Sequence, residues 1–466
     1  MRVLHLVSLA RIGVAFVIPD EEILRDVAIE SHHQVNSVSE QVPCEGKISK
    51  DLQDAFHSVK QGSTDIIDDA LSMASDANDA TSKSVYEMGF DVDSWLQSSH
   101  EHMEVETDEQ DHPPHHKPHH PPHHKPNMTV YELISKSKYT TKLAKLIDEF
   151  PDLVETLNGT AANYTVFAPT DAAFEKIPEH APKPSKELLK AVLSYHVSPA
   201  FYPAGRVLWT YTIPTLYNES DLAEEPVPQR LSISFGLGGL KVNFYSKIMA
   251  VNIFGTNGVI HGVDHIIVPP PDTLTILSFF PGEFSTLELG LTKTGLLDTL
   301  NTTAHTGGTF FAPSNFAFKK LGPRINGFLF SKWGEKYLKG LLKYHIVHNQ
   351  TLYSDAFYTV DTTEAEVTRP PYVHLDLPTL LEDHSLAIDL LRRGPFITIK
   401  INGFSTVTVH DGVAKDGVIQ VVSNVLVPPK KLSGSSEPQF WTGEEMTVEE
   451  FKARLEPFVS DESFEL

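Results

Sequence analysis

The stretch Tyr164-Thr-Val-Phe-Ala-Pro-Thr-Asp-Ala-Ala-Phe174 decides the organisation of this chain, because its pattern occurs a second time. At Thr309-Phe-Phe-Ala-Pro-Ser-Asn-Phe-Ala-Phe318 the same order returns: β-prone residues, Ala-Pro, a hydroxyl residue, Asp or Asn, and an apolar pair. Each copy predicts a short strand that ends at proline. In the first copy, Thr170 or Asp171 is expected to cap the helical turn that follows.

Two further motifs follow in the same order. The pair Tyr195-His196 is matched by Tyr344-His345, and Asn257-Gly-Val-Ile-His-Gly-Val-Asp-His-Ile-Ile-Val-Pro-Pro270 is matched by Asp416-Gly-Val-Ile-Gln-Val-Val-Ser-Asn-Val-Leu-Val-Pro-Pro429. The offsets between the copies are 144, 149 and 159 residues. Three motifs in one order with a growing offset indicate two tandem domains, 129–271 and 272–430, the second with insertions. Each is long enough to bury its own core.

Within each copy the apolar pattern changes from a helical to an alternating period, which predicts an α+β fold. Thr129, with Glu132 three residues later, forms a capping-box pattern, and Ser185 is expected to begin a helix that ends at Tyr195-His196. Gly236–Gly239 and Asn402-Gly403 are typical hairpin turns.

Three element boundaries are also predicted by the pattern. The last strands are expected to run from Val259 to Val268 and from Val418 to Val427. Ser331 is expected to cap the next helix of the second copy.

In the tail, 431–466, apolar residues from Met446 to Val459 form one helical stripe. That short helix is expected to dock on the second domain, with partner binding as the alternative.

The formal net charge of −23 is distributed unevenly along the 466 residues. From Asp20 to Asp111 there are 23 Asp and Glu but five Lys and Arg. This acidic, Ser-rich composition predicts a largely disordered arm over 19–110. A protein that binds nucleic acid needs a basic face, and the composition therefore excludes nucleic acid as a partner.

Two features predict entry into the secretory pathway. The apolar run Val3 to Ile18 follows Arg2, which is typical of a signal peptide at 1–18, either cleaved or kept as an anchor. No other stretch is long and apolar enough to span a bilayer. Six glycosylation sequons occur where chance would give roughly two. They begin at Asn127, Asn158, Asn163, Asn218, Asn301 and Asn349. The alternative is a cytosolic chain with a fortuitous apolar start.

A His/Pro-rich linker occupies 111–128. Proline favours an extended spacer. Paired imidazoles can bind zinc, copper or nickel and gain charge near pH 6. The alternative is a spacer whose histidines have no role. The candidate metal ligands are His112, His115, His116, His119, His120, His123 and His124. The only cysteine, Cys44, excludes both an intramolecular disulfide and a thiolate metal site.

The three motifs together resemble the fasciclin-domain family. The first copy matches all of them, and the second departs at Asn315 for the usual Asp and at Gln420 for the usual His. The resemblance implies a compact unit in which helices pack on a twisted β-sandwich wedge. It also implies a role in adhesion or in matrix and wall interactions, without a catalytic site. The acidic arm and the linker are similar to those of fungal fasciclin-domain proteins that are secreted or vacuolar.

The histidines of the motifs are expected to be structural. His261 and His265 lie on a predicted strand, where residues four apart are about 13 Å from each other and cannot share one ion. His261 matches the family motif and is expected to make a structural hydrogen bond. His196 and His345 follow tyrosine at a helix end, where imidazole can bond free carbonyls. Asp171 is interpreted as a cap rather than a general base.

We therefore expect a protein that is not an enzyme and that needs no cofactor. The function predicted is an adhesion-type or scaffold module of the secretory pathway, extracellular, wall-bound or vacuolar, that binds a protein or a cell-wall or matrix glycan. Two alternatives stay open. One is a vacuole-lumen protein in membrane trafficking or turnover. The other is metal handling through the His-rich linker.

Overall fold

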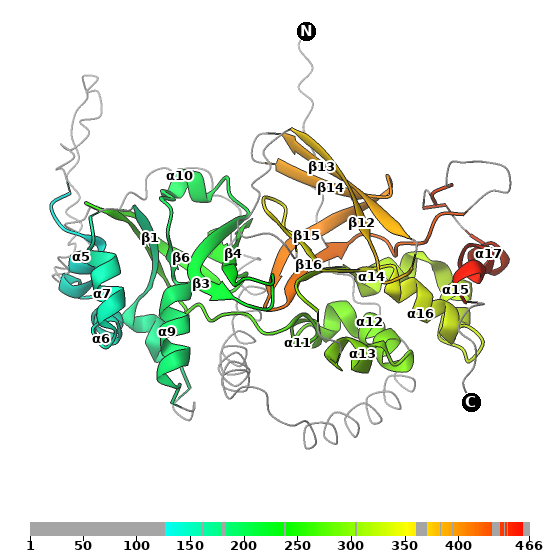
Figure 1. The fold of residues 1–466 in the computed structure, drawn as a ribbon, viewed down its shortest axis with the longest axis horizontal. Coiled ribbons are helices and arrows are strands. Elements are labelled where there is room, and N and C mark those ends of the chain that lie inside the picture. Colours follow the sequence, from blue (N-terminus) through cyan, green and yellow to red (C-terminus); the bar gives the residue numbers. More distant parts are fainter. Residues whose placement is uncertain are drawn as a thin grey trace, which may run out of the picture. The chain divides into compact units, whose positions relative to one another are not determined.

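A computed structural model of the chain describes residues 126–160, 163–178, 183–236, 239–302, 305–359, 371–382, 384–393, 396–430, 439–441, 443–444 and 446–459. The predictions for the signal peptide, the acidic arm and the histidines at 112–124 lie outside these residues. Each sequence repeat forms one seven-stranded sheet with helices packed on it (Figure 1). The α+β fold of two tandem domains is confirmed.

The first repeat places helices before, between and beside its strands. Its sheet order is β2-β1-β7-β6-β5-β4-β3, with β1 and β7 parallel and the other neighbours antiparallel. The helices are α5 (Val130–Lys136), α6 (Thr141–Ile147), α7 (Pro151–Asn158), α8 (Asp171–Glu175), α9 (Lys186–Tyr195) and α10 (Ala204–Val207). The strands are β1 (Tyr164–Pro169), β2 (Val197–Ser198), β3 (Thr212–Glu219), β4 (Val227–Gly236), β5 (Gly239–Val242), β6 (Ser246–Gly255) and β7 (Gly258–Val263).

The second repeat has the same connectivity, in the order β12-β13-β14-β15-β16-β8-β9, and adds a two-stranded hairpin of β10 and β11. Its helices are α11 (Thr273–Ser278), α12 (Pro281–Lys293), α13 (Leu296–Thr302), α14 (Asn315–Lys320), α15 (Gly322–Leu329), α16 (Glu335–Lys343) and α17 (Val448–Val459). Its strands are β8 (Gly308–Pro313), β9 (Ile346–His348), β10 (Gln350–Leu352), β11 (Phe357–Thr359), β12 (Tyr372–Pro378), β13 (Ser385–Arg393), β14 (Phe396–Ile401), β15 (Ser405–Ala414) and β16 (Gly417–Val422).

Local chemistry sets several of these boundaries. The capping box at α5 is confirmed, because Glu132 N donates to Thr129 Oγ1 at 3.2 Å and Thr129 N donates to Glu132 Oε2 at 2.9 Å. Ser185 caps α9 by accepting from Leu188 N at 3.2 Å. Pro151 and Pro281 occupy the first position of their helices, where a missing N–H costs nothing.

Three predicted boundaries are wrong. The last strands end at Val263 and Val422 rather than at Val268 and Val427. Beyond these points the chain leaves the sheet, because its backbone N–H groups bond to buried histidines instead of to a strand. Ser331 does not cap the next helix. Its hydroxyl donates to Phe328 O at 2.6 Å, and α16 begins four residues later, after Gly334.

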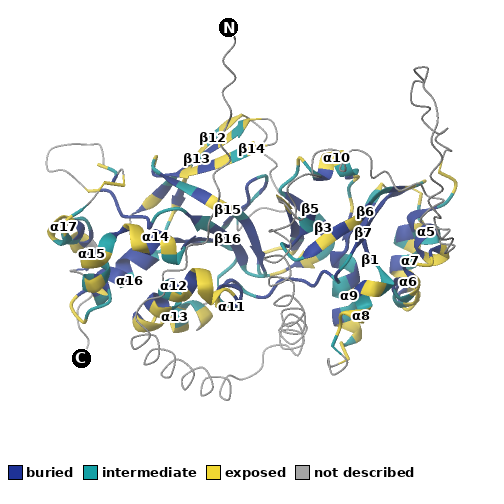
Figure 2. Ribbon diagram, turned by 180° about the vertical axis from the view of Figure 1, so that it is seen from behind, coloured by how far each residue is buried: buried dark blue, intermediate teal, exposed yellow. Residues whose placement is uncertain are grey.

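Apolar clusters line both faces of each sheet. The parallel inner strands contain no exposed residue, and every residue of β7 is buried (Figure 2). In the second repeat, Phe451 and Leu455 of α17 are buried in the same cluster as α16. The tail helix thus belongs to the core of the second repeat. Among the described residues, no helix is both long and apolar enough to cross a membrane.

The first two residues of the third motif join strand to helix. Asn257 accepts from Val130 N at 2.9 Å and donates to Leu157 O at 2.8 Å, so it ties α5 and α7 to the sheet. The next residue must be glycine, because a Cβ on Gly258 would lie 2.3 Å from Tyr164 O. Gly417, its counterpart, would place a Cβ 2.2 Å from Gly308 O.

Replacement of this glycine should therefore destabilise the fold. We expect Gly258→Ala to lower the free energy of unfolding by about 1–3 kcal/mol, since the parallel strands β1 and β7 would have to separate. Gly282→Ala is the matched control, because nothing lies within 4 Å of a Cβ there. Urea denaturation of both variants measures the difference. Equal midpoints would contradict the steric argument.

Candidate functional site

The two histidines of the Tyr-His motif link a helix end to the segment after the last strand. His196 Nδ1 bonds Val192 O at 2.7 Å, and its Nε2 accepts from Ile267 N at 2.9 Å. His345 does the same with Leu341 O at 2.8 Å and Leu426 N at 2.8 Å. Burial lowers the pKa of each imidazole to about 4. Both ring nitrogens of each are thus occupied inside the protein, and neither ring is available to a ligand.

The tyrosines of the motif hold the sharp turn of a hairpin. Asn243 and Asn402 adopt the left-handed conformation, with φ of 48° and 51°. Their side-chain amides donate to Tyr195 Oη and Tyr344 Oη, each at 2.9 Å. Asparagine tolerates this conformation better than most residues. The Tyr-His motif therefore has the same structural role in both repeats. Its histidine links the helix end to the segment after the last strand, and its tyrosine bonds the asparagine of the hairpin turn.

His261 and Gln420 occupy the same place in the two repeats and have the same main contact. His261 Nε2 bonds Tyr202 O at 2.8 Å, and Gln420 Nε2 donates to Leu352 O at 2.9 Å. Burial lowers the pKa of His261 to about 4. A neutral amide thus replaces a neutral imidazole without loss of the hydrogen bond.

Asp171 is a cap, but for a different helix from the one expected. Thr170 is the N-cap residue of α8 and makes no side-chain capping bond there. Asp171 instead accepts from Thr141 N at 3.2 Å and from Lys142 N at 2.8 Å, which are the first residues of α6. Asn315 makes the corresponding contact in the second repeat, where it accepts from Thr286 N at 2.9 Å, but Thr286 lies inside α12 (Pro281–Lys293), so this contact is not a cap. The prediction that Thr170 or Asp171 caps the following helix is therefore confirmed for the N-cap position of Thr170 and wrong for a side-chain capping bond.

His261 and His265 do not form a metal site. His265 donates to Asp264, with Nδ1 and Oδ1 2.8 Å apart, and Lys176 lies 3.3 Å from the other oxygen of Asp264. Within the part of the chain that the structure describes, no group of three His, Cys, Asp or Glu side chains could hold a metal ion.

The six sequon asparagines all lie in described segments and are exposed.

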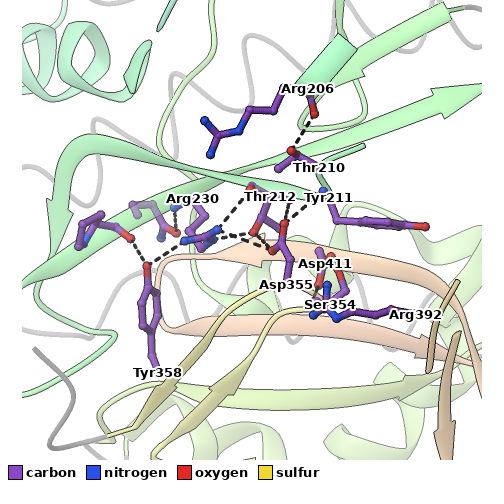
Figure 3. A network of polar contacts seen from close by, with 12 residues as sticks. Arg206, Thr210, Tyr211, Thr212, Arg230, Ser354, Asp355, Tyr358, Arg392 and Asp411 are labelled. Carbon is purple, nitrogen blue, oxygen red and sulfur yellow. Dashed lines mark hydrogen bonds and ion pairs between the residues drawn. The ribbon is translucent and has the colours of Figure 1, made fainter. Parts of the chain in front are cut away.

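A network of polar contacts lies where the two repeats meet (Figure 3). Arg230 of β4 is buried, and its guanidinium donates to Thr212 Oγ1 at 2.6 Å and to Thr212 O at 3.2 Å. It lies 3.7 Å from a carboxylate oxygen of Asp355, in the turn between β10 and β11. Asp355 in turn accepts from Thr212 N at 2.9 Å and from Tyr211 N at 3.2 Å. An aspartate of the second repeat thus bonds the edge strand of the first.

Apolar and backbone contacts surround this pair. Leu222, Ala223 and Val227 of the first repeat form one buried cluster with Tyr353, Ala356, Tyr358, Val413 and Val418 of the second. Gln229 Nε2 donates to Ala414 O at 2.9 Å, and Gly307 N donates to Asp221 O at 2.7 Å. The repeats therefore share a buried interface with its own small core.

A second carboxylate lies beside Asp355 and is fully buried. Asp411 accepts from Ser354 N at 2.8 Å and from Gln420 Nε2 at 2.9 Å, and the Ser354 hydroxyl also donates to it. Burial and the nearby Asp355 raise its pKa to about 6. Its counterpart in the first repeat is Asn252, which accepts from Ala204 N at 2.8 Å. The serine hydroxyl and the glutamine amide are thus two donors that satisfy the buried charge.

The interface residues differ between the repeats, although their backbone positions correspond. The matching hydrogen bonds of Asn252 and Asp411 place Gly205 at the position of Asp355. Those of Tyr195 and Tyr344 place Ser385 at the position of Arg230. The arginine of the ion pair therefore occurs only in the first repeat, and the aspartate only in the second. The pair is a feature of the tandem arrangement and not of the repeated fold.

Comparison with known proteins identifies this fold. The family model described as the fasciclin domain matches residues 138–269 and 282–428, together more than half of the chain. The chain belongs to the fasciclin-domain family.

Three relatives illustrate the range of the family. The chain is similar to Aurofusarin biosynthesis cluster protein S of Gibberella zeae, with 30% identity over 323 residues, 66% of this chain and 78% of that protein. It is 30% identical to Stabilin-2 of Rattus norvegicus over 40% of this chain, but over only 13% of that protein. It is 29% identical to Cell surface glycolipoprotein MPB83 of Mycobacterium bovis over 29% of this chain and 56% of that protein.

Sequence reasoning missed Arg230, Asp355 and Asp411. Alignment of the two fasciclin domains gives a signal for Asp411, because it replaces an asparagine in the same repeat that has Gln420 for histidine. No such signal exists for Arg230 and Asp355, which belong to different domains and meet only in the folded tandem.

The buried histidines should make the protein lose stability in acid. The pKa of His261 in the folded state, about 4, is below its ordinary value of 6.5, so the unfolded state binds the proton more readily. The stability due to neutral His261 is present above pH 6.5 and is lost as the pH falls towards 4. We expect His261→Gln, which copies Gln420, to reduce this loss by roughly 3 kcal/mol at most.

Urea denaturation of the wild type and of His261→Gln between pH 4 and 7 measures the effect. The variant should be as stable as the wild type near pH 7 and should show a shallower decline in acid. An unchanged dependence on pH would contradict the assignment of His261 as a buried neutral group.

Proposed function

We propose that this chain is a non-enzymatic adhesion-type or scaffold module of the secretory pathway, which binds a protein or a glycan partner. The observation that carries the proposal is that the polar groups of the family motifs bond inside the fold. His196, His345, His261 and Asp171 all have structural partners. We therefore expect a partner to bind the outer surface of the two-domain unit.

The relatives support this proposal by their names. The mycobacterial relative is called a cell surface glycolipoprotein, which agrees with a location outside the cytosol. The fungal relative is named as a biosynthesis cluster protein, which agrees with the scaffold form of the proposal. The exposed sequons agree with entry into the secretory pathway.

Two alternatives remain as proposals. In a vacuole-lumen protein of membrane trafficking or turnover, the linker histidines would gain charge as the pH falls. In a metal-handling protein, the same histidines would bind zinc or copper. Calorimetric titration of zinc with the full chain and with a chain lacking 111–126 separates the second alternative, since a millimolar or weaker affinity argues against it.

Fractionation of native cells tests the main proposal. We expect the protein in the medium or wall fraction, with a mobility on gels that shifts after N-glycosidase treatment. Asn127→Gln should remove one step of that shift, because Asn127 is exposed ahead of α5. A shift confined to a vacuolar fraction would favour the trafficking alternative. A cytosolic protein without a shift would contradict the secretory proposal.

A further inference from the structure

The hairpin of β13 and β14 extends beyond its counterpart in the first domain. Counted from the equivalent pairs Ile233–Val242 and Ile388–Ile401, strand pairing ends three pairs later in the first domain, at Gly236–Gly239. In the second domain it continues for five pairs, to Arg393–Phe396. The repeated fold does not need this extension, since the first domain forms its seven-stranded sheet without it.

One face of the extended hairpin exposes three large apolar side chains. Tyr372, Leu391 and Phe396 are 54%, 44% and 72% exposed. Tyr372 is paired with Leu391, and Leu391 is paired with Thr398, two residues along β14 from Phe396. The three side chains therefore lie on the same face of neighbouring strands.

The opposite face of these strands supplies the core. Leu390 and Ile399 are buried there. The exposed apolar side chains thus contribute nothing to the inner packing of the second domain. An apolar patch of this kind, bordered by polar residues, commonly marks a binding surface.

Polar groups lie within the same patch. Asp389 accepts from the hydroxyl of Tyr372 and from Nδ1 of His374, each at 2.7 Å. Lys400 is the cross-strand neighbour of Asp389. The hydrogen bond to Asp389 raises the pKa of His374. These three polar residues therefore lie in the row beside Tyr372, and Phe396 lies four residues along β14 from Lys400, about 13 Å away.

This mixture of groups fits one class of partner better than others. The centre of a protein–protein interface is depleted of charged residues, which gather at its rim. Here charged groups occupy the row next to the apolar side chains. A pyranose ring needs both, because its C–H face packs on an aromatic ring while its hydroxyls bond carboxylates and cations at the ring edge.

We propose that the outer face of β12, β13 and β14 binds a neutral polysaccharide, with sugar rings on Tyr372 and Phe396 and hydroxyls bonded to Asp389, His374 and Lys400. This inference rests on the proposed function and names the glycan as the partner. It also assigns the binding face to the second domain alone, because the first domain lacks the extension.

Co-sedimentation of the full-length protein with particulate β-1,3-glucan, chitin and cellulose tests the proposal. We expect binding to at least one of them, and an affinity roughly tenfold lower for Phe396→Ala and for Tyr372→Ala. Trp333→Ala is the control, because Trp333 is 82% exposed between α15 and α16, outside the patch. It should bind as the wild type does. All three variants should keep the wild-type thermal midpoint, since the replaced side chains are exposed.

Three outcomes would overturn the proposal, and they separate it from the proposed function. Equal binding by Phe396→Ala and the wild type would place the glycan elsewhere and leave the adhesion role intact. Failure of the wild type to bind any of the polysaccharides, with a protein partner or a second copy whose association Phe396→Ala abolishes, would make the face a protein-binding surface. Failure to bind any polysaccharide, with no protein partner at the wall or in the medium, would remove the proposed function as well.

Discussion

A buried guanidinium in the first domain meets a carboxylate from the second, and the tandem arrangement depends on this contact. Arg230 has nearly no contact with water, so its charge must be met by Thr212 and Asp355. A buried ion pair adds little net stability, because desolvation of both groups offsets their attraction. Its loss is costly, however, because the remaining charge is left unpaired. The apolar cluster around Tyr353 and Tyr358 supplies favourable free energy, and we expect the ion pair to select one way for the domains to meet.

The two domains share the contacts that form each fold, and they differ in residues at their interface. The tyrosine–asparagine joint, the bridging histidine and the glycine between parallel strands occur in both. Asn315 departs within the second domain, where it bonds α12, whereas other departures lie at the interface. Asp411 replaces an asparagine, and Ser354 and Gln420 supply the donors that its buried carboxylate needs. Since burial raises the pKa of Asp411 to about 6, this group binds a proton more tightly in the folded state and opposes the loss of stability caused by the buried histidines in acid.

The sequence predicted the duplication, the α+β fold, the caps at Thr129 and Ser185 and the turn at Asn402-Gly403, because these depend on residues near one another in the chain. It failed where the partner is distant. Asp171 caps a helix that begins 30 residues earlier, and the last strands end early because buried histidines from other elements take their N–H groups. The interface pair required knowledge of how two folded domains meet. The exposed face of β12 to β14 could not be predicted either, since alternation identifies two faces without saying which one is covered.

The most direct test of the shared interface is scanning calorimetry of the full chain with Asp355→Ala. Asp221→Ala is the control, because the pair of Asp221 with Lys415 is partly exposed and should contribute less than about 1 kcal/mol. We predict that the wild type and Asp221→Ala unfold in one transition that includes both domains. Asp355→Ala should leave Arg230 buried without its partner and separate the unfolding into two transitions. A single transition at the wild-type temperature in Asp355→Ala would contradict the coupling of the two domains through this contact.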